Sequence, residues 1–136
     1  MKKVIVIVCI IILCVCLCFF YIHDERGQTE KEEYCYKINA LIKDADFNIA
    51  KIEGSKIMLY DIERNLTDEI AFEDYSSKFE IEYIRKEDEI IYFVFDVAVD
   101  DEWGIIFVND DSDKMLNGIK SIKRIGGNSY SYSTIE

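Results

Sequence analysis

The sequence has no proline, a single histidine and only six glycines in 136 residues. The absence of proline is compatible with long, continuous strands. The single histidine, His23, directly follows an apolar run, which argues against a Ser–His or Cys–His nucleophilic system and against zinc-hydrolase motifs. No glycine-rich phosphate-binding loop is present. We therefore predict that the chain is not an enzyme and has no catalytic, cofactor-binding or metal-binding residues.

Basic residues are also scarce, with 16 Lys and Arg against 27 Asp and Glu. Lys2 and Lys3 precede the apolar run, whereas every acidic residue follows it. Nucleic acids and anionic lipid surfaces attract proteins through positive charge, so this balance argues against both as partners. An acidic surface suits solubility, a cationic partner or divalent cations.

The longest apolar stretch is Val4 to Ile22, nineteen residues without a charge, Gly or Pro. A helix of this length spans roughly 28 Å, close to the hydrocarbon thickness of a bilayer. Lys2 and Lys3 lie before it, and Asp24 and Glu25 follow it. The positive-inside rule then predicts a single-pass signal-anchor in the bilayer through residues 4–22, with a cytoplasmic N-terminus and an extracytoplasmic C-terminal domain.

A cleaved signal peptide is the alternative, because a basic segment precedes the apolar run. In that case the protein would be a secreted domain. The run is long for a signal peptide and no A-x-A-like site follows it, although Cys16 and Cys18 are small enough to substitute. We expect the segment to be retained.

Four of the five cysteines lie within this run. Residues two apart point in different directions on a helix, so the C-x-C-x-C pattern does not predict a metal site. The simple interpretation is that cysteine serves as a small apolar residue in lipid. The alternative is that Cys14 and Cys18 form a small-x-x-x-small surface for a homodimer through the membrane helix.

The remaining chain is predicted to contain a linker at 23–29 and one extracytoplasmic domain at 30–136. Gly27 is expected to end the membrane helix, and Thr29 with Glu32 has capping-box spacing. A second, amphipathic helix is predicted from Glu30 to Ala45, because apolar residues recur at helical spacing. Its expected buried stripe consists of Tyr34, Ile38, Leu41, Ile42 and Ala45, with Cys35 buried beside it.

Alternating patterns and turn residues then predict a mostly antiparallel sheet of six to seven strands, giving an α+β fold with one helix packed on the sheet. The segment 90–99 is apolar on both faces and should be central, and the last strand should lie at an edge. Strand patterns are found at 47–53, 56–62, 78–85, 90–99, 104–109, 119–125 and 130–135, and a weaker one lies around 70–72.

Two acidic clusters lie near the segment 104–109 and raise the question of calcium. The first is Asp100, Asp101 and Glu102, and the second is Asp110, Asp111 and Asp113. Neither has the Gly and Glu spacing of an EF-hand, and a strand between them would hold them about 20 Å apart. A short helical turn at 112–117, capped by Asp111 or Ser112, explains the second cluster more simply.

Two functions remain for the domain. The first is a membrane-anchored binding or interaction module of a bacterial envelope with an unknown protein partner. Its contact residues would be Asp100, Asp101, Glu102 and Trp103, which we expect on an exposed turn. The alternative is a small envelope hydrolase in which Asp96 and Glu80 or Glu82 form paired carboxylates. Otherwise Asp96, which interrupts an apolar strand, should pair with Arg85 or Lys123 or face outward.

Overall fold

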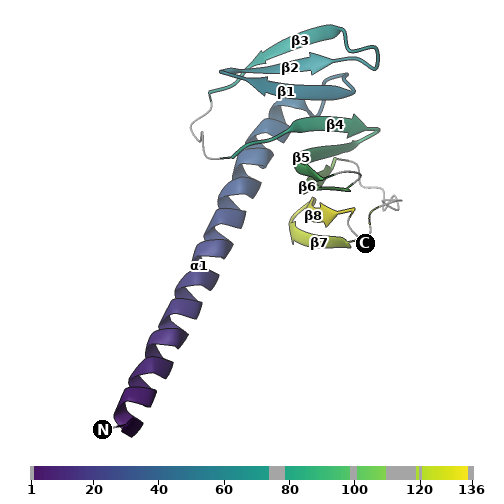
Figure 1. The fold of residues 1–136 in the computed structure, drawn as a ribbon. Helices are drawn as coiled ribbons and strands as arrows, with labels where there is room; N and C mark the ends of the chain where they lie inside the picture. The colour runs from purple at the N-terminus through teal and green to yellow at the C-terminus, as the bar shows by residue number, and fades with distance from the viewer. Residues whose placement is uncertain (1, 74–78, 99–100, 110–118, 120, 135–136) are drawn as a thin grey trace. The chain divides into compact units, whose positions relative to one another are not determined.

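The computed structural model describes residues 2–73, 79–98, 101–109, 119 and 121–134 (Figure 1). The chain divides into two compact units, Met1–Glu33 and Tyr34–Glu136. The first is helical throughout its described residues. The second contains the last turns of the same helix and a single sheet.

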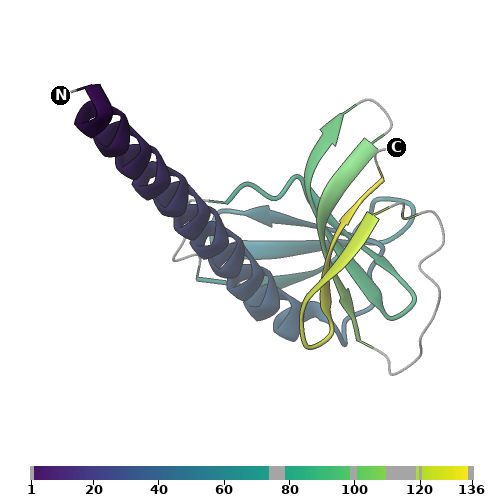
Figure 2. The same ribbon diagram turned by 90° about the horizontal axis from the view of Figure 1, so that it is seen from below.

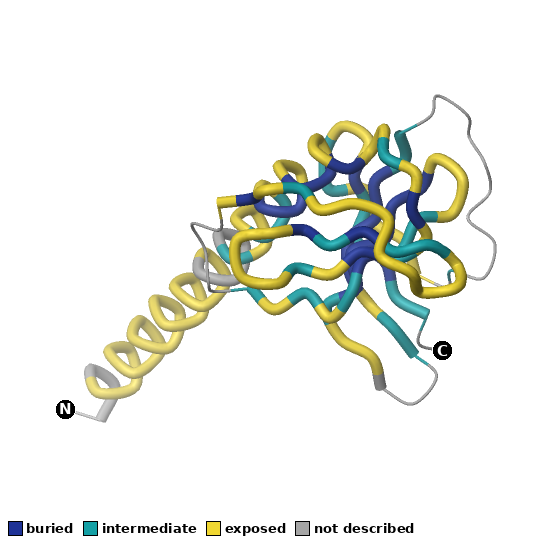
Figure 3. The backbone as a smooth tube through the Cα atoms, turned by 90° about the horizontal axis from the view of Figure 1, so that it is seen from above, coloured by how far each residue is buried: buried dark blue, intermediate teal, exposed yellow. Residues whose placement is uncertain are grey.

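Helix α1 runs from Lys2 to Ile42. The described side chains from Ile5 to Ile22 are exposed, as the yellow turns near the N-terminus show in Figure 3. This helix is long and apolar enough to cross a membrane. The prediction that Gly27 ends one helix and that another begins at Glu30 was wrong. Gly27 costs a helix only about 1 kcal/mol relative to alanine, and good helix formers on both sides outweigh that cost.

The sheet has eight strands, all paired antiparallel, where six to seven were expected. Their order across the sheet is β3-β2-β1-β4-β5-β6-β8-β7. The α+β class is confirmed. The strands are β1 Ile49–Glu53, β2 Lys56–Tyr60, β3 Leu66–Ala71, β4 Tyr83–Glu87, β5 Ile90–Ala98, β6 Asp101–Val108, β7 Ser121–Gly126 and β8 Ser129–Ser133.

Several strand predictions are confirmed. Strands β1 and β2 form a hairpin across Gly54, whose φ of 60° is one that glycine adopts without strain. Strand β5 lies between β4 and β6, well inside the sheet. The C-terminal hairpin pairs β7 with β8.

Other predictions need correction. Strand β4 begins at Tyr83 and not near residue 78. Strand β6 begins at Asp101, so Asp101, Glu102 and Trp103 lie in a strand and not in a turn. The last strand, β8, is covered on both edges, and β7 is the edge strand instead. The helical turn expected at 112–117 lies outside the described residues.

One face of the sheet, here the helix face, packs against residues 34–42 of α1 and forms the main core. Tyr34, Cys35, Ile38 and Ile42 of the helix are buried there, which confirms the predicted burial of Cys35. Leu41 is 46% exposed, so its predicted place in the buried stripe was wrong. The sheet contributes Ala50, Ile57, Leu59, Ile84, Ile91, Phe93, Ile105 and Phe107.

Tyr34, Ile38 and Ile42 of the predicted stripe are buried, but Asn39 is buried where Leu41 was expected, and a polar contact shows why. Asn39 is buried and exchanges two amide hydrogen bonds with Asn109, at 2.9 and 3.1 Å. The Nζ of Lys86 donates to the backbone oxygens of Lys43 and Ala45 at 2.8 and 2.7 Å, just beyond the helix C-terminus. These contacts orient Asn39 toward the sheet and leave Leu41 outside.

The sheet is strongly twisted, and Figure 2 shows β1 to β3 running across the direction of β7 and β8. The register of β5 against β6 shifts between Val94 and Asp96. At this irregularity Gly104 approaches the neighbouring backbone so closely that an added Cβ would lie 1.8 Å from the carbonyl oxygen of Phe93. Only glycine fits there without displacement of β5 or β6.

Candidate functional site

The second face of the sheet, opposite the helix face, carries five of the nine tyrosines. Tyr60, Tyr83, Tyr92, Tyr130 and Tyr132 lie on it, and we call it the tyrosine face. Directly paired residues share a face. The strand registers therefore place one row across seven strands, from β2 to β7: Tyr60, Ile49, Arg85, Tyr92, Ile106, Tyr130 and Arg124.

The part of the tyrosine face over β5, β6 and β8 is buried. Ile90, Tyr92, Val94, Ile106 and Tyr132 form a second apolar cluster, with Tyr83 and Ile119 packed against it. The Tyr92 and Tyr132 rings meet edge-on with centroids 5.6 Å apart. This cluster gives the face a closely packed centre.

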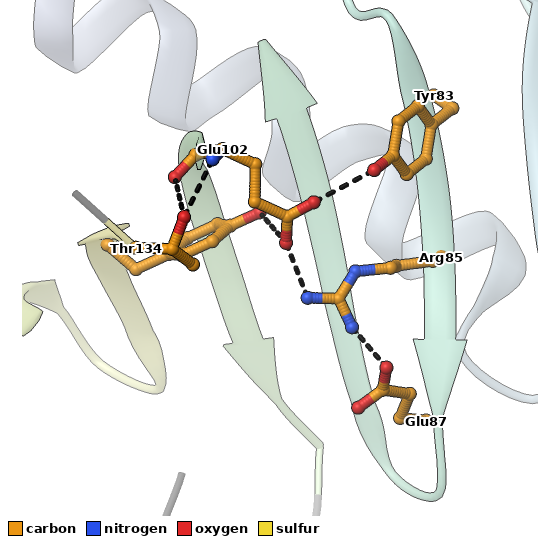
Figure 4. Close-up of polar contacts among 6 residues, drawn as sticks. Tyr83, Arg85, Glu87, Glu102 and Thr134 are labelled. Atoms are coloured by element: carbon orange, nitrogen blue, oxygen red, sulfur yellow. Dashed lines mark hydrogen bonds and ion pairs between the residues drawn. The ribbon is translucent and has the colours of Figure 1, made fainter. Parts of the chain in front are cut away.

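Glu102 lies at the border of this cluster and accepts hydrogen bonds from three side chains (Figure 4). The Tyr83 hydroxyl donates to its Oε2 at 2.8 Å. Arg85 Nη2 and the Tyr132 hydroxyl donate to its Oε1 at 2.5 and 3.2 Å. Only 15% of the Glu102 side chain and 23% of the Arg85 side chain are exposed. The three donors come from β4 and β8, so Glu102 links strands on both sides of β5 and β6.

The backbone of Glu102 is fixed as well. Its N–H donates to Thr134 Oγ1 at 2.7 Å, and its carbonyl accepts from the Thr134 N–H at 2.9 Å and from its hydroxyl at 3.2 Å (Figure 4). Arg85 stacks on Tyr92, with its guanidinium carbon 3.6 Å from the ring centroid, and also pairs with Glu87. The two charged side chains of this network, Glu102 and Arg85, are therefore each held in place by several contacts.

Burial and charge shift the ionisation of these groups in consistent directions. Burial alone would raise the pKa of Glu102, but hydrogen bonds from Arg85, Tyr83 and Tyr132 and the Arg85 charge outweigh it and lower that pKa. Burial and the Glu102 carboxylate raise the pKa of Tyr83 to about 12. The same causes raise the pKa of Tyr132. At neutral pH the network therefore consists of a carboxylate, a guanidinium and two neutral phenols.

Beside this network the tyrosine face is hollowed over β1, β2 and β4. The hollow has a volume of about 470 Å³ and is lined by Ile49, Lys51, Tyr60, Arg64, Glu82 and Tyr83. This volume lies in the range of small-ligand sites. Tyr83 belongs to both features, because its ring lines the hollow while its hydroxyl is held by Glu102.

The predicted contact residues have different surroundings. Asp100 lies outside the described residues. Asp101 and Glu102 are partly buried, and the Trp103 ring stacks on Phe95 with centroids 6.0 Å apart. Phe95 packs against the core beneath the helix face, so Trp103 and Glu102 serve opposite faces of β6. Their role in partner contact stays a prediction.

The carboxylates considered for a hydrolase, Asp96, Glu80 and Glu82, are all exposed. Arg85, one of the two expected partners of Asp96, pairs with Glu102 and Glu87 instead, and the exposed Asp96 agrees with the alternative that it faces outward. Within the described residues, no three His, Cys, Asp or Glu side chains are grouped so that they could hold a metal ion. The cluster at Asp110, Asp111 and Asp113 lies outside those residues.

Sequence reasoning missed Arg85, Tyr132, Lys51 and Arg64 as members of one face. A weak signal was present, since alternation places Tyr83 and Arg85 on the same side of one strand, and Tyr130 and Tyr132 on the same side of another. Their meeting depends on the strand order, which places β8 before β7 beside β6. Comparison with family models, curated proteins and solved structures finds no match for this chain.

Proposed function

We propose that this protein is a membrane-anchored, extracytoplasmic binding module of a bacterial envelope, and that it contacts a protein partner through the tyrosine face. Helix α1 supplies the anchor, through residues 4–22. Lys2 and Lys3 favour a cytoplasmic N-terminus, which leaves residues 23–136 outside.

The observation that carries the binding role is the hollow beside a closely packed tyrosine cluster. Tyrosine contributes large contact area and a polar group at little cost in conformational entropy, and it is enriched at protein interfaces. Tyr83 cannot change its orientation freely, because Glu102 fixes its hydroxyl. The Glu102 carboxylate is itself occupied by Arg85 and Tyr132, so these groups support a surface instead of performing acid–base chemistry.

Photo-crosslinking in the native host tests which face is used. Benzoylphenylalanine replaces Tyr60 or Tyr130 on the tyrosine face, or Tyr36 as the control. Tyr36 lies on α1 within the second unit and is exposed. We expect adducts of one common mass from the first two positions, suppressed by excess wild-type chain, and none from Tyr36. Adducts from Tyr36 alone, or from none of the three, would contradict the proposal.

Protease added to intact cells or protoplasts tests the topology. We expect removal of the domain and a residual membrane fragment that retains the N-terminus. A mature protein that begins near residue 19 would show that the segment is a cleaved signal peptide.

A further inference from the structure

We propose that the hollow on the tyrosine face binds a carboxylate of a peptide, with Lys51 and Arg64 as its charged contacts. This inference rests on the proposed binding function and names the chemistry that the partner presents. It assigns the ligand class to one place on the face, the part lined by β1, β2, β4 and the turn after β2.

Two cationic side chains line the hollow, and their positive charge favours an anionic group. Lys51 and Arg64 come from separate elements, β1 and the turn between β2 and β3, and both line the hollow. Within the part of the chain that the structure describes, neither forms an ion pair or a side-chain hydrogen bond. Most other cations of the sheet are engaged: Lys56 pairs with Glu69, Arg85 with Glu102, and Lys86 and Arg124 donate to backbone carbonyls. Lys123 on the edge strand β7 also has no such partner among the described residues, but it does not line the hollow.

The backbone at Arg64 has an unusual conformation that supports a binding role for this residue. Its φ of 66° lies in the left-handed region, which costs energy for a residue with a long side chain. The Asp61 carboxylate maintains this turn by accepting hydrogen bonds from the Asn65 backbone N–H at 2.8 Å and from its side-chain amide at 3.2 Å. These bonds lower the pKa of Asp61, which favours its carboxylate form. The turn therefore holds a cation at the hollow in a conformation that asparagine or glycine would adopt more easily.

The charge of the hollow favours a carboxylate over a phosphate. Glu82 also lines the hollow, so two cations and one carboxylate give it a single net positive charge. The whole chain carries a net charge of −11, which repels a dianion more strongly than a monoanion. A single carboxylate matches the hollow, and arginine and lysine both bind this group by charge-assisted hydrogen bonds.

The size of the hollow and the apolar side chains near it favour a peptide over a small free acid. A carboxylate alone fills a small part of 470 Å³. Leu66 of β3 lies opposite Tyr60, which lines the hollow, and 47% of Leu66 is exposed. Ile62, in the same turn as Arg64, is 82% exposed. A peptide that extends from the hollow over these side chains would bury apolar surface that is otherwise in water.

Saturation-transfer NMR on the full chain in nanodiscs of neutral lipid tests the inference. The probes are acetyl-Gly-Ala-Leu with a free C-terminus, its C-terminal amide, acetyl-Gly-Glu-Leu amide, acetate and inorganic phosphate. We expect at least one carboxylate peptide to bind about tenfold more tightly than the uncharged amide and more tightly than acetate, corresponding to one charge-assisted contact. Preference for the first peptide identifies a C-terminal carboxylate, and preference for the glutamate peptide identifies a side chain.

Three variants locate the site. Lys51→Gln and Arg64→Asn should each weaken binding by about three- to tenfold, and asparagine tolerates the left-handed turn. Lys123→Gln makes the same charge change as Lys51→Gln on edge strand β7 and should leave affinity unchanged. Equal binding of acid and amide, no binding of any carboxylate peptide, tighter binding of phosphate, or an equal effect of Lys123→Gln would overturn the inference. If crosslinks at Tyr60 persisted in that case, the binding face would stand and only its ligand class would be wrong.

Discussion

Replacing Glu102 with glutamine tests the network that supports the tyrosine face. Glutamine keeps the shape of the side chain but removes the charge that Arg85, Tyr83 and Tyr132 contact. Hydrogen bonds to a charged group contribute roughly 1.5–3 kcal/mol each, whereas neutral ones contribute about 1. Arg85 keeps its contact with Glu87 and some solvent, which reduces the loss. We expect the free energy of unfolding to fall by about 2 kcal/mol.

The assay is thermal unfolding of the full chain in detergent, followed by fluorescence of Trp103, the only tryptophan. It lies next to Glu102 in β6, so it reports on the strand that the network holds. For a domain of this size, 2 kcal/mol corresponds to a decrease in Tm of about 10 °C. Glu87→Gln is the control, because the Glu87 side chain is 62% exposed and its ion pair should contribute less than about 1 kcal/mol.

The pH dependence gives a second test of the same network. The pKa of Glu102 is lower in the folded chain than its ordinary value of 4.5, so the folded state favours the carboxylate. Its stabilising contribution is present above pH 4.5 and is lost as the pH falls through the folded pKa. The stability difference between wild type and Glu102→Gln should therefore be constant near neutrality and decrease in acid. Equal stability of Glu102→Gln and wild type at pH 7, or a difference that grows in acid, would refute the reasoning.

Two further substitutions test the core and the close approach in the sheet. Ile38→Asp places an unpaired charge in the core of the helix face and should lower the free energy of unfolding by about 4 kcal/mol. Lys43→Asp, just after the helix, should lower it by less than about 1 kcal/mol. Similar melting temperatures for the two variants would contradict the packing. Gly104→Ala should destabilise the chain by about 3 kcal/mol or prevent folding, because its Cβ would collide with the Phe93 carbonyl. Gly27→Ala, the control, should be neutral or stabilising. Thermal unfolding followed by circular dichroism compares the two variants, and a tolerated Gly104→Ala would be inconsistent with the register of β5 and β6.

The sequence predicted the elements with strong local signals. Nineteen uncharged residues, the Gly54 turn and the alternation of serine and tyrosine near the C-terminus each indicate their structure without reference to distant residues. The helix stripe was predicted correctly at Tyr34, Ile38 and Ile42 but not at Leu41, because the Asn39–Asn109 amide pair is a contact between residues 70 positions apart. Local periodicity contains no information about such a pair.

Most of the candidate site could not be predicted from the sequence, because it too depends on contacts between residues that are distant in the chain. Glu102 was selected as an exposed contact residue, but it is held by side chains from β4 and β8 that only the strand order brings near it. Lys51 and Arg64 look like ordinary surface cations in the sequence. Their shared hollow requires the register of β1, β2 and β4 and the left-handed turn at Arg64.

Hydrogen exchange read by mass spectrometry tests the central claim most directly, namely that the tyrosine face over β1 and β2 is occupied by a partner. The chain is labelled in membrane vesicles from the native host, where the partner is present, and as the purified chain in nanodiscs. The account predicts slower exchange in the native membranes for β2 and the turn at 61–65, with equal exchange for the edge strand β7. Equal exchange in every segment, or protection confined to β7 or to residues 34–42 of α1, would contradict it.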